Sequence, residues 1–304
     1  MARLAVITDD PGWHGRILRQ AFGDRGHEVF FLSLVDCHLS LESGSLPIQL
    51  PGFEDGLPDG VFVRGVPGGT LEQVTLHLDI LHGLELLGIP VYNDTRAIER
   101  TVDKAMTSLL LHQAGIPTPP AWIIRDPETA RERVLAELSK GHRVVSKPLF
   151  GSQGVGLRRY SEVNDLDGFG PDNGIFYLQR FVDSGSASHD FRIFVVGGRA
   201  IAAMRRSGLS WLNNVHQGAR CEAVPLEERL LVRLAEEAVH TLGMHYAGVD
   251  VIRDLHGKAL VLEVNSIPAW KGLQGVTEVP IADRLADDFL NLIHPPQGLI
   301  QRQT

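Results

Sequence analysis

The sequence is short of several features that would place it in particular classes of protein. It has only two cysteines among 304 residues, Cys37 and Cys221, and they form no CxxC pair. A structural zinc site is therefore not expected, and the count suits a reducing cytosol. The longest apolar stretches are too short to span a bilayer. The N-terminus goes directly into a strand-like run at residues 4–7, and it lacks a basic segment followed by a long apolar core. We therefore expect no signal peptide and a cytoplasmic protein without a membrane partner.

Positive charge is also scarce. The chain has 29 Lys and Arg against 37 Asp and Glu, a net charge of −8 and a pI of about 5.9. No basic face of the kind that neutralises phosphate backbones is present, which argues against nucleic acid as the main partner. An acidic enzyme with an anionic substrate must instead gather its cations locally. The length exceeds the usual limit of one core, so two or three lobes are expected.

The first 93 residues alternate between strand and helix patterns. Such alternation predicts a parallel sheet with ligands near the carboxyl ends of its strands. Residues 40–58, rich in Ser, Gly and Pro, are predicted to be a surface loop. The expected strands are at about 3–7, 28–34, 60–64 and 90–92, and the expected helices at 13–26 and 70–88.

From residue 94 the pattern changes to helices and antiparallel strands, with Gly197-Gly198 as a hairpin turn. The expected helices are 94–100, 101–115, 127–140 and 226–243, and the expected strands are 121–124, 143–147, 175–182, 190–196, 199–206, 246–253 and 258–264. We therefore divide the chain into an α/β domain at 1–93, a lobe at 94–182, a second lobe at 183–295 and a loose tail at 296–304.

A glycine-rich segment follows a strand that carries a lysine. Lys147 ends the strand, and Gly151-Ser152-Gln153-Gly154-Val155-Gly156 comes next. Glycines let backbone N–H groups approach phosphate oxygens, and an upstream lysine adds a point charge for the same phosphates. The segment fits neither a Walker A motif nor a dinucleotide fingerprint. A hairpin turn that merely needs glycine is the alternative.

Three oxygen-bearing side chains lie on two strands near the end of the chain. Glu263 and Asn265 are two residues apart and project from one face of a strand, and Asp250 meets them if the two strands pair through a turn near His256-Gly257. Two carboxylates and an amide oxygen suit Mg²⁺, which also binds nucleotide phosphates. Exposed polar positions alternating with apolar ones are the alternative.

Basic and amide side chains cluster between these two signals. Asp190 and Arg192 begin one strand, Arg205-Arg206 ends the next, and Asn214 and His216 follow on an expected loop. Arginines here can balance phosphates or clamp a carboxylate. For any single one of them, a solvated surface cation is the alternative.

Taken in order, these residues resemble the ATP-grasp superfamily and, within it, the RimK-type α-L-glutamate ligases, which add glutamate to a ribosomal protein or to tetrahydromethanopterin. The resemblance runs from about residue 94 to 290 and implies an ATP-grasp fold, with two lobes that clasp ATP behind an N-terminal parallel α/β domain. The residues that carry it are Lys104, Lys147 with the GSQGVG segment, Leu178-Gln179-Arg180-Phe181-Val182, Asp190-Phe191-Arg192, Arg206, Asn214, Asp250, Glu263 and Asn265.

The resemblance also implies roles. Lys104 and Lys147, with Gly151, Ser152, Gln153 and Gly154, would hold ATP phosphates. Gln179, Arg180, Phe181 and Val182 would form the hinge that contacts adenine, largely through backbone groups. Asp190 matches a position near the ribose and phosphates, Arg206 a cation on the phosphate side, and Asn214 an active-site amide. Asp250, Glu263 and Asn265 match the ligands of magnesium (or manganese), with two ions expected.

The sequence departs from the family pattern in three places. Arg180 stands where an acidic residue often follows the hinge glutamine, and Leu212 stands where an arginine is common. The segment Ser266-Ile267-Pro268-Ala269-Trp270-Lys271-Gly272 replaces a small Ser-Pro-Gly turn. Trp270 and Lys271 could therefore shape a different acceptor pocket, and further candidates are Asp10, Trp13, His14 and Arg64, each of which also fits helix capping or turn chemistry.

The expected reaction is formation of an amide through an acyl phosphate. A carboxylate acceptor, either a small molecule or a peptide, would attack ATP, and the amine of an amino acid would attack the activated carbonyl. The chain shows no Ser-His-Asp or Cys-His constellation that demands a covalent protein intermediate. Two alternatives stay open: another ATP-grasp ligase, like glutathione synthetase or a lysine- or arginine-biosynthesis ligase, and an ATP-binding scaffold without turnover. Relatives that are often oligomers imply a homo-oligomer.

Overall fold

The fold is known from a computed structural model, which describes residues 1–151, 154–185, 188–208, 211 and 219–294. The chain forms two compact units. Unit 1 comprises Met1–Glu99, Met244–Tyr246 and the chain from Ser266 onward, and unit 2 comprises Arg100–Gly243 and Ala247–Asn265. The finer sequence-based division at residues 93 and 182 stays a prediction, and the expected loose tail lies outside the described residues.

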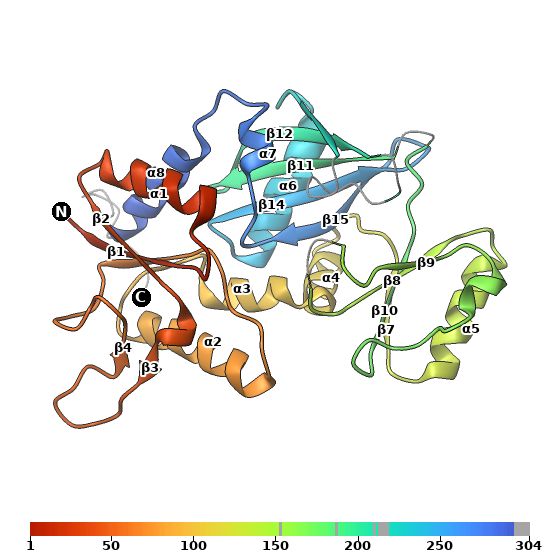
Figure 1. The fold of residues 1–304 in the computed structure, drawn as a ribbon. Coiled ribbons are helices and arrows are strands. Elements are labelled where there is room, and N and C mark those ends of the chain that lie inside the picture. The colour runs from red at the N-terminus through yellow and green to blue at the C-terminus, as the bar shows by residue number, and fades with distance from the viewer. Residues whose placement is uncertain (152–153, 186–187, 209–210, 212–218, 295–304) are drawn as a thin grey trace. The chain divides into compact units, whose positions relative to one another are not determined.

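Unit 1 is built on a four-stranded parallel sheet with the order β2-β1-β5-β6, as the alternating sequence pattern predicts (Figure 1). Helices α1 and α8 pack against each other, and Thr70 and Gln73 form a capping box at the start of α2. The strands are β1 (Arg3–Ile7), β2 (Glu28–Leu32), β5 (Gly60–Val63) and β6 (Val91–Tyr92), and the helices are α1 (Gly12–Gly23), α2 (Leu71–Leu86), α3 (Thr95–Val102), α7 (Lys271–Gln274) and α8 (Ile281–Ile293).

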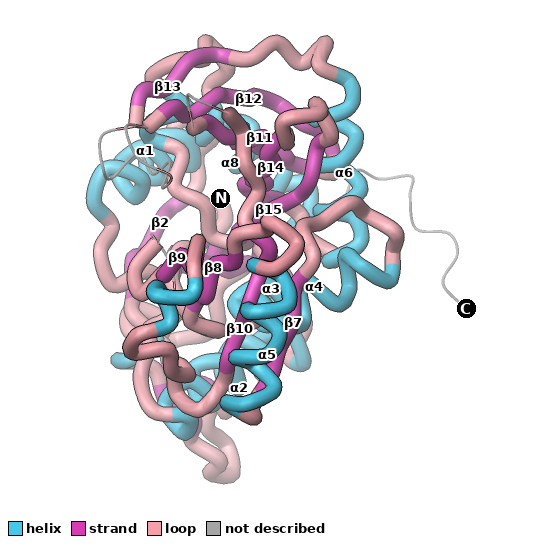
Figure 2. Tube along the Cα trace, turned by 90° about the vertical axis from the view of Figure 1, so that its right-hand side faces the viewer, coloured by secondary structure: helices cyan, strands magenta, loops and turns pink. Residues whose placement is uncertain are grey.

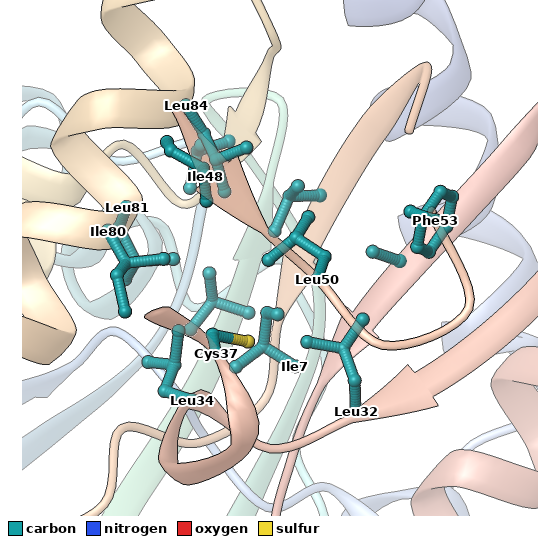
Figure 3. Packing of buried hydrophobic residues seen from close by; sticks show 14 of the residues in the cluster. Ile7, Leu32, Leu34, Cys37, Ile48, Leu50, Phe53, Ile80, Leu81 and Leu84 are labelled. Carbon is teal, nitrogen blue, oxygen red and sulfur yellow. The ribbon is translucent and has the colours of Figure 1, made fainter. Parts of the chain in front are cut away.

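The prediction of a surface loop at residues 40–58 is wrong for its second half. A short 3₁₀ turn, η1 (Leu34–Asp36), leads into a two-stranded ribbon of β3 (His38–Leu39) and β4 (Ile48–Gln49). Ile48, Leu50 and Phe53 are all buried in the core cluster of unit 1 (Figure 3). Gly83 of α2 makes room for Ile48, since a Cβ there would lie 2.8 Å from its Cδ1. The Ser, Gly and Pro content of the segment hid three apolar side chains that fold back onto the sheet.

Asn93 joins three separate stretches of unit 1. Its amide nitrogen donates to the carbonyl oxygens of Tyr246 and Ser266, both at 2.8 Å. Its amide oxygen accepts from the backbone N–H groups of His245 and Tyr246, at 2.8 and 3.0 Å. The side chain is fully buried, so no water replaces a lost partner. All four hydrogen bonds of one amide therefore fasten residues 244–246 and the segment after Asn265 to the sheet.

Replacing Asn93 by alanine should lower the free energy of unfolding by at least about 3 kcal/mol. Four buried backbone groups would lose their partner, and each unsatisfied group costs about 1–3 kcal/mol when it is not rehydrated. Denaturant unfolding of the purified protein measures the loss. Asn291, exposed on α8, provides the control: its replacement by alanine should change stability by less than about 0.5 kcal/mol. Equal stabilities of the two variants would contradict the role of Asn93.

The smaller sheet of unit 2 is antiparallel, with the order β7-β10-β8-β9. Helix α5 lies against β7, β8 and β10 (Figure 2), and its N-cap is Asp126, whose carboxylate accepts from the backbone N–H of Thr129 at 2.7 Å. Apolar side chains of α5 and the sheet form one core. The elements are β7 (Ala121–Ile124), α5 (Pro127–Leu138), β8 (Val144–Lys147), β9 (Arg158–Tyr160), η2 (Val163–Leu166) and β10 (Phe176–Arg180).

The larger sheet of unit 2 has the order β13-β12-β11-β14-β15, and α6 packs against β11, β12 and β15 (Figure 1). The predicted turn at Gly197-Gly198 joins β11 to β12. Helix α4 (Lys104–Gln113) packs on α6. The elements are β11 (His189–Val196), β12 (Arg199–Ser207), β13 (Arg220–Ala223), α6 (Arg229–Leu242), β14 (Tyr246–Arg253) and β15 (Ala259–Asn265).

Candidate active site

The predicted pairing of the two strands that carry Asp250, Glu263 and Asn265 is confirmed. Strands β14 and β15 are antiparallel, and Asp250 lies directly opposite Glu263, while Asn265 lies opposite Gly248. Directly opposed residues of an antiparallel pair project from the same face. The three oxygen-bearing side chains therefore share one face of the larger sheet.

Asp250 is tied to two arginines of the same sheet, one on the adjacent strand β11 and one on β12 beyond it. Arg192 of β11 donates from Nε to Oδ1 at 2.5 Å and from Nη2 to Oδ2 at 2.7 Å. Arg206 of β12 reaches Oδ2 of Asp250 at 3.0 Å and Oδ1 of Asp190 at 2.7 Å. The exposed fractions of the Asp190, Arg206 and Asp250 side chains are 10%, 7% and 8%, so this chain of alternating charges is buried.

The charges of this network oppose the cost of burial. Burial acts to raise the pKa of Asp250, but the charges and hydrogen bonds of Arg192 and Arg206 outweigh it and hold that pKa below its ordinary value. For Asp190 the balance is reversed: burial raises its pKa to about 6 against the attraction of Arg206. Asp250 is therefore held as the anion.

Glu263 and Asn265 keep oxygen atoms for a ligand. Glu263 is half-buried and forms no ion pair with a described residue, although it faces the carboxylate of Asp250. Asn265 donates its amide N–H to the carbonyl oxygen of Gly248 at 3.3 Å. Because Arg192 and Arg206 already pair with Asp250, the charge that remains for a cation is that of Glu263. In the described part of the chain no three His, Cys, Asp or Glu side chains gather as a metal site. The donors at this place are the carboxylates of Asp250 and Glu263 and the amide oxygen of Asn265. That all-oxygen set fits Mg²⁺.

Both predicted phosphate lysines lie within electrostatic reach of Glu263. Burial lowers the pKa of Lys104 and of Lys147, and in both cases the charge of Glu263 opposes this shift. Lys104 is the first residue of α4, and its Nζ donates to the carbonyl oxygens of Gly151 and Leu149 at 2.7 and 3.4 Å. The fold therefore brings Lys104 and Lys147, which are 43 positions apart in the sequence, within electrostatic reach of Glu263 on β15.

The glycine-rich segment connects the antiparallel strands β8 and β9. Gly154 and Gly156 both have a φ of +76°, and a Cβ on Gly156 would lie 2.7 Å from Cγ of Pro148. Glycine is required at Gly156 both for its left-handed backbone and for this close approach. Ser152, Gln153 and Asn214 lie outside the described residues, so their predicted roles stay predictions.

Two backbone N–H groups of the hinge segment, residues 179–182, already form hydrogen bonds within the protein. The N–H of Arg180 donates to the carbonyl of Pro120, and that of Phe181 to the carbonyl of Arg143, both at 2.8 Å. Gln179 is buried within β10. Among the described residues no hydrogen bond is made by the N–H of Val182, so this group is the hinge donor that remains for a ligand.

Arg180, which departs from the family pattern, points to the helix that covers the smaller sheet. Its Nε and Nη2 lie 2.9 and 2.7 Å from Oε2 of Glu137, a residue of α5 that is only 1% exposed. Phe181 has the guanidinium groups of Arg143 and Arg159 over its ring, at 4.5 and 5.4 Å. The sequence did not reveal that Glu137 pairs with Arg180, because no local pattern relates these two positions. It placed Arg192 among the arginines that can balance phosphates or clamp a carboxylate, but it did not identify Asp250 as the carboxylate that Arg192 holds.

Unit 1 gathers most of the acceptor candidates at the carboxyl ends of β1 and β5. His14 and Trp13 lie in the first turn of α1, and their rings contact that of Trp270 at centroid distances of 4.5 and 6.4 Å. The guanidinium of Arg64 lies 4.5 Å over the Trp270 ring, and Lys271 begins α7. We call Trp13, His14, Arg64, Trp270 and Lys271 the edge cluster. Asp10 is exposed, its carbonyl accepts from the Thr8 hydroxyl, and no contact joins it to the cluster among the described residues.

His14 should make the stability of the protein depend on pH between about 6.5 and 4. Burial, followed by the charges of Arg64 and Lys271, lowers its pKa to about 4. The unfolded chain therefore binds this proton at a higher pH than the folded chain, so the stabilisation is complete above about pH 6.5 and is lost as the pH falls towards 4. Glutamine can also accept the N–H of Trp270 but does not titrate. The loss of stability between pH 7 and pH 5, measured by urea unfolding, should be smaller in the His14→Gln variant. Equal losses would rule out this contribution.

The comparisons with known proteins agree with this geometry. Residues 101–289, more than half of the chain, match the RimK-like ATP-grasp domain. The chain therefore belongs to the RimK-like ATP-grasp family. It is an ATP-dependent ligase that joins a carboxylate to an amine through an amide bond. None of the described helices is long and apolar enough to cross a membrane.

Two curated relatives and one solved structure show the extent of the similarity. The chain is 36% identical over 239 residues to the tetrahydromethanopterin:alpha-L-glutamate ligase of Methanococcus maripaludis, covering 76% of this chain and 78% of the relative. It is 29% identical over 289 residues to a probable alpha-L-glutamate ligase of Shewanella amazonensis, covering 92% of each. The structure of the ATP-grasp ligase PsnB with a minimal precursor, Mg and ADP superposes with a TM-score of 0.72 at 22% identity, covering 96% of this chain and 97% of that one.

Proposed function

We propose that this ligase uses ATP and Mg²⁺ to add L-glutamate to the carboxylate of an acceptor. One observation carries the proposal: Lys104, Lys147 and Glu263 act electrostatically on one another, and Glu263 lies opposite Asp250. Cations for phosphates beside carboxylates for a metal are what a site for Mg·ATP requires. The names of the two curated relatives support glutamate as the amino acid.

The described residues of the candidate site take the following roles in this proposal. Lys104 and Lys147 would bind the phosphates of ATP, and the N–H of Val182 would bind its adenine. Asp250, Glu263 and Asn265 would hold magnesium, with two ions as the expected number. Bound there, magnesium would supply positive charge against the charge that develops on the phosphates during transfer. Arg206 would hold Asp250 as an oriented anion through their ion pair. Its positive charge would also attract the phosphates of ATP.

The reaction follows from these positions. An oxygen of the acceptor carboxylate attacks the γ-phosphorus of ATP, the bond to the β-phosphate oxygen breaks, and ADP leaves. The amine of glutamate then attacks the acyl carbon of the acyl phosphate, and inorganic phosphate leaves with the amide formed and a proton released. Catalysis rests on positioning and charge neutralisation, since no protein nucleophile is required.

ADP release tests the proposal directly. Purified protein is incubated with Mg·ATP, L-glutamate and a panel of carboxylate acceptors that includes reduced pterin cofactors and short peptides. We expect sustained turnover of ATP to ADP only when acceptor and glutamate are both present, a mass gain of one glutamyl residue on the acceptor, and no ADP after EDTA is added. A mass gain from another amino acid would instead assign the chain to a different ATP-grasp ligase activity. ATP binding without ADP release for every acceptor would favour a scaffold. Whether the protein forms an oligomer stays a prediction.

A further inference from the structure

The edge cluster of unit 1 carries positive charge that no acidic side chain balances. In the described part of the chain no Asp or Glu lies within ion-pair distance of Arg64 or Lys271, whereas other half-buried arginines such as Arg25 and Arg180 are paired with carboxylates. The protein as a whole has a net charge of −8, so acids for such pairing are not scarce. Two unbalanced cations side by side on an acidic protein form a local site for an anion.

Arg64 is held in place but not fully satisfied. Its Nη1 donates to the carbonyl oxygen of Pro268 at 3.0 Å, its guanidinium stacks over Trp270, and its charge faces the hydroxyl of Tyr246. Its Nε is buried and has no hydrogen-bond partner among the described residues. A guanidinium that is fixed by stacking and by its hydrogen bond to Pro268, and that is only half-buried, is prepared for a planar anion, because little side-chain entropy is left to lose on binding.

The neutral state of His14 is consistent with the positive charges of Arg64 and Lys271 beside it. Its Nε2 accepts the backbone N–H of Trp270 at 3.1 Å, so this nitrogen carries no proton in the structure. A protonated imidazole at this place would be repelled by the two neighbouring cations. The neutral ring instead packs edge-on between Trp13 and Trp270 and contributes an apolar wall. The cluster therefore combines two cations with aromatic surface at the carboxyl edge of a parallel sheet, where ligands of such sheets bind.

We propose that Arg64 and Lys271, flanked by Trp13, bind a carboxylate group of the acceptor. The inference rests on the proposed function for the identity of the ligand, and it deepens that function by assigning a substrate site. The acceptor is favoured over the incoming amino acid by the charge of the cluster. The α-ammonium group of an amino acid would be repelled by these two cations, and no Asp or Glu pairs with them among the described residues.

Binding of small carboxylates without ATP provides the test. N-acetyl-L-glutamate, which has two carboxylates and no free amine, represents the acceptor, and L-glutamate represents the incoming amino acid. Quenching of tryptophan fluorescence reports binding, because Trp13 and Trp270 lie in the cluster. We expect saturable binding of N-acetyl-L-glutamate that is tighter than that of L-glutamate. Arg64→Gln and Lys271→Gln should each weaken it by at least about tenfold, as expected for loss of a charged hydrogen bond.

Two further variants separate binding from folding. Arg64→Lys keeps the charge without the planar fork and should weaken binding less than Arg64→Gln does. Arg16, exposed on the same helix as His14, supplies the matched control, since Arg16→Gln removes one nearby charge and should leave binding unchanged. Lys271 is exposed, so loss of binding in Lys271→Gln cannot be attributed to unfolding.

The outcomes distinguish the inference from the proposed function. Binding that is absent in the wild type, equal in Arg64→Gln, or tighter for L-glutamate would overturn the acceptor site, even if the protein turns over ATP. Binding that depends on Arg64 and Lys271 in a protein that never releases ADP would leave the carboxylate site standing and would overturn the ligase assignment instead.

Discussion

Replacing Glu263 by glutamine is expected to lower the rate of acceptor-dependent ADP formation by at least about a thousandfold. Charge stabilisation by a bound metal ion is worth several kcal/mol in the transition state, and each 1.4 kcal/mol is about tenfold in rate. Glutamine keeps the size of the side chain and one carbonyl oxygen but loses the negative charge opposite Asp250. The change removes the one carboxylate that acts on both Lys104 and Lys147.

The measurement is the initial rate of ADP formation at saturating substrates, beside the affinity for ADP in EDTA. Nucleotide binding without metal should stay within about threefold of the wild type, because both lysines and the hinge remain. Glu237→Gln, which removes an exposed carboxylate from α6, serves as the matched control and should leave the rate unchanged. A rate that falls less than tenfold in Glu263→Gln would show that this carboxylate does not hold the metal.

The sequence predicted those parts of the fold that repeat a local pattern. Alternation of strand and helix gave the parallel sheet of unit 1, and Gly197-Gly198 marked the hairpin between β11 and β12. The apolar residues Ile281, Leu285 and Phe289 have the spacing of a helix face, so the signal for α8 was present but unused. Strands β3, β4 and β9 are two or three residues long, too short for any period to show.

In the candidate site, too, local spacing predicts some contacts, and the tertiary fold alone determines the others. The two-residue spacing of Glu263 and Asn265 placed them on one face, and the turn after Asp250 predicted the pairing that the structure confirms. The ion pair of Glu137 with Arg180 depends on how α5 packs over β10, which no local spacing encodes. The edge cluster is a similar case, because His14 and Trp270 are 256 residues apart and meet only through the tertiary fold.

The buried network around Asp250 gives the largest expected effect on stability. Arg206 contacts both Asp190 and Asp250, and all three side chains are at least nine-tenths buried. Among the described residues, replacing Arg206 by methionine would leave Asp190 with no ion pair and Asp250 with Arg192 alone. Removal of one partner from a buried ion pair costs about 3–5 kcal/mol, since a charge stays buried without compensation. We expect a loss of this size in the free energy of unfolding, measured with urea.

The neighbouring residue on β12 is the matched control. Arg205 pairs with Glu222 on β13, but both side chains are substantially exposed, at 45% and 35%. Methionine at position 205 should therefore cost less than about 1 kcal/mol. The two variants remove the same group from adjacent positions of one strand, and they contrast a buried guanidinium that holds two carboxylates with an exposed one that holds one. Equal losses would show that the network around Asp250 does not hold the larger sheet together.

The loss in Arg206→Met should also grow as the pH rises from 5 to 8. Burial already raises the pKa of Asp190 to about 6 while Arg206 is present, and removal of the guanidinium raises it further. A folded-state pKa above that of the unfolded chain means that the folded protein binds more protons, so its stability falls with rising pH. At pH 5 a protonated Asp190 no longer needs a cation, and the deficit shrinks. A deficit that stays constant between pH 5 and pH 8 would place the cost in lost side-chain packing and not in the unpaired carboxylate.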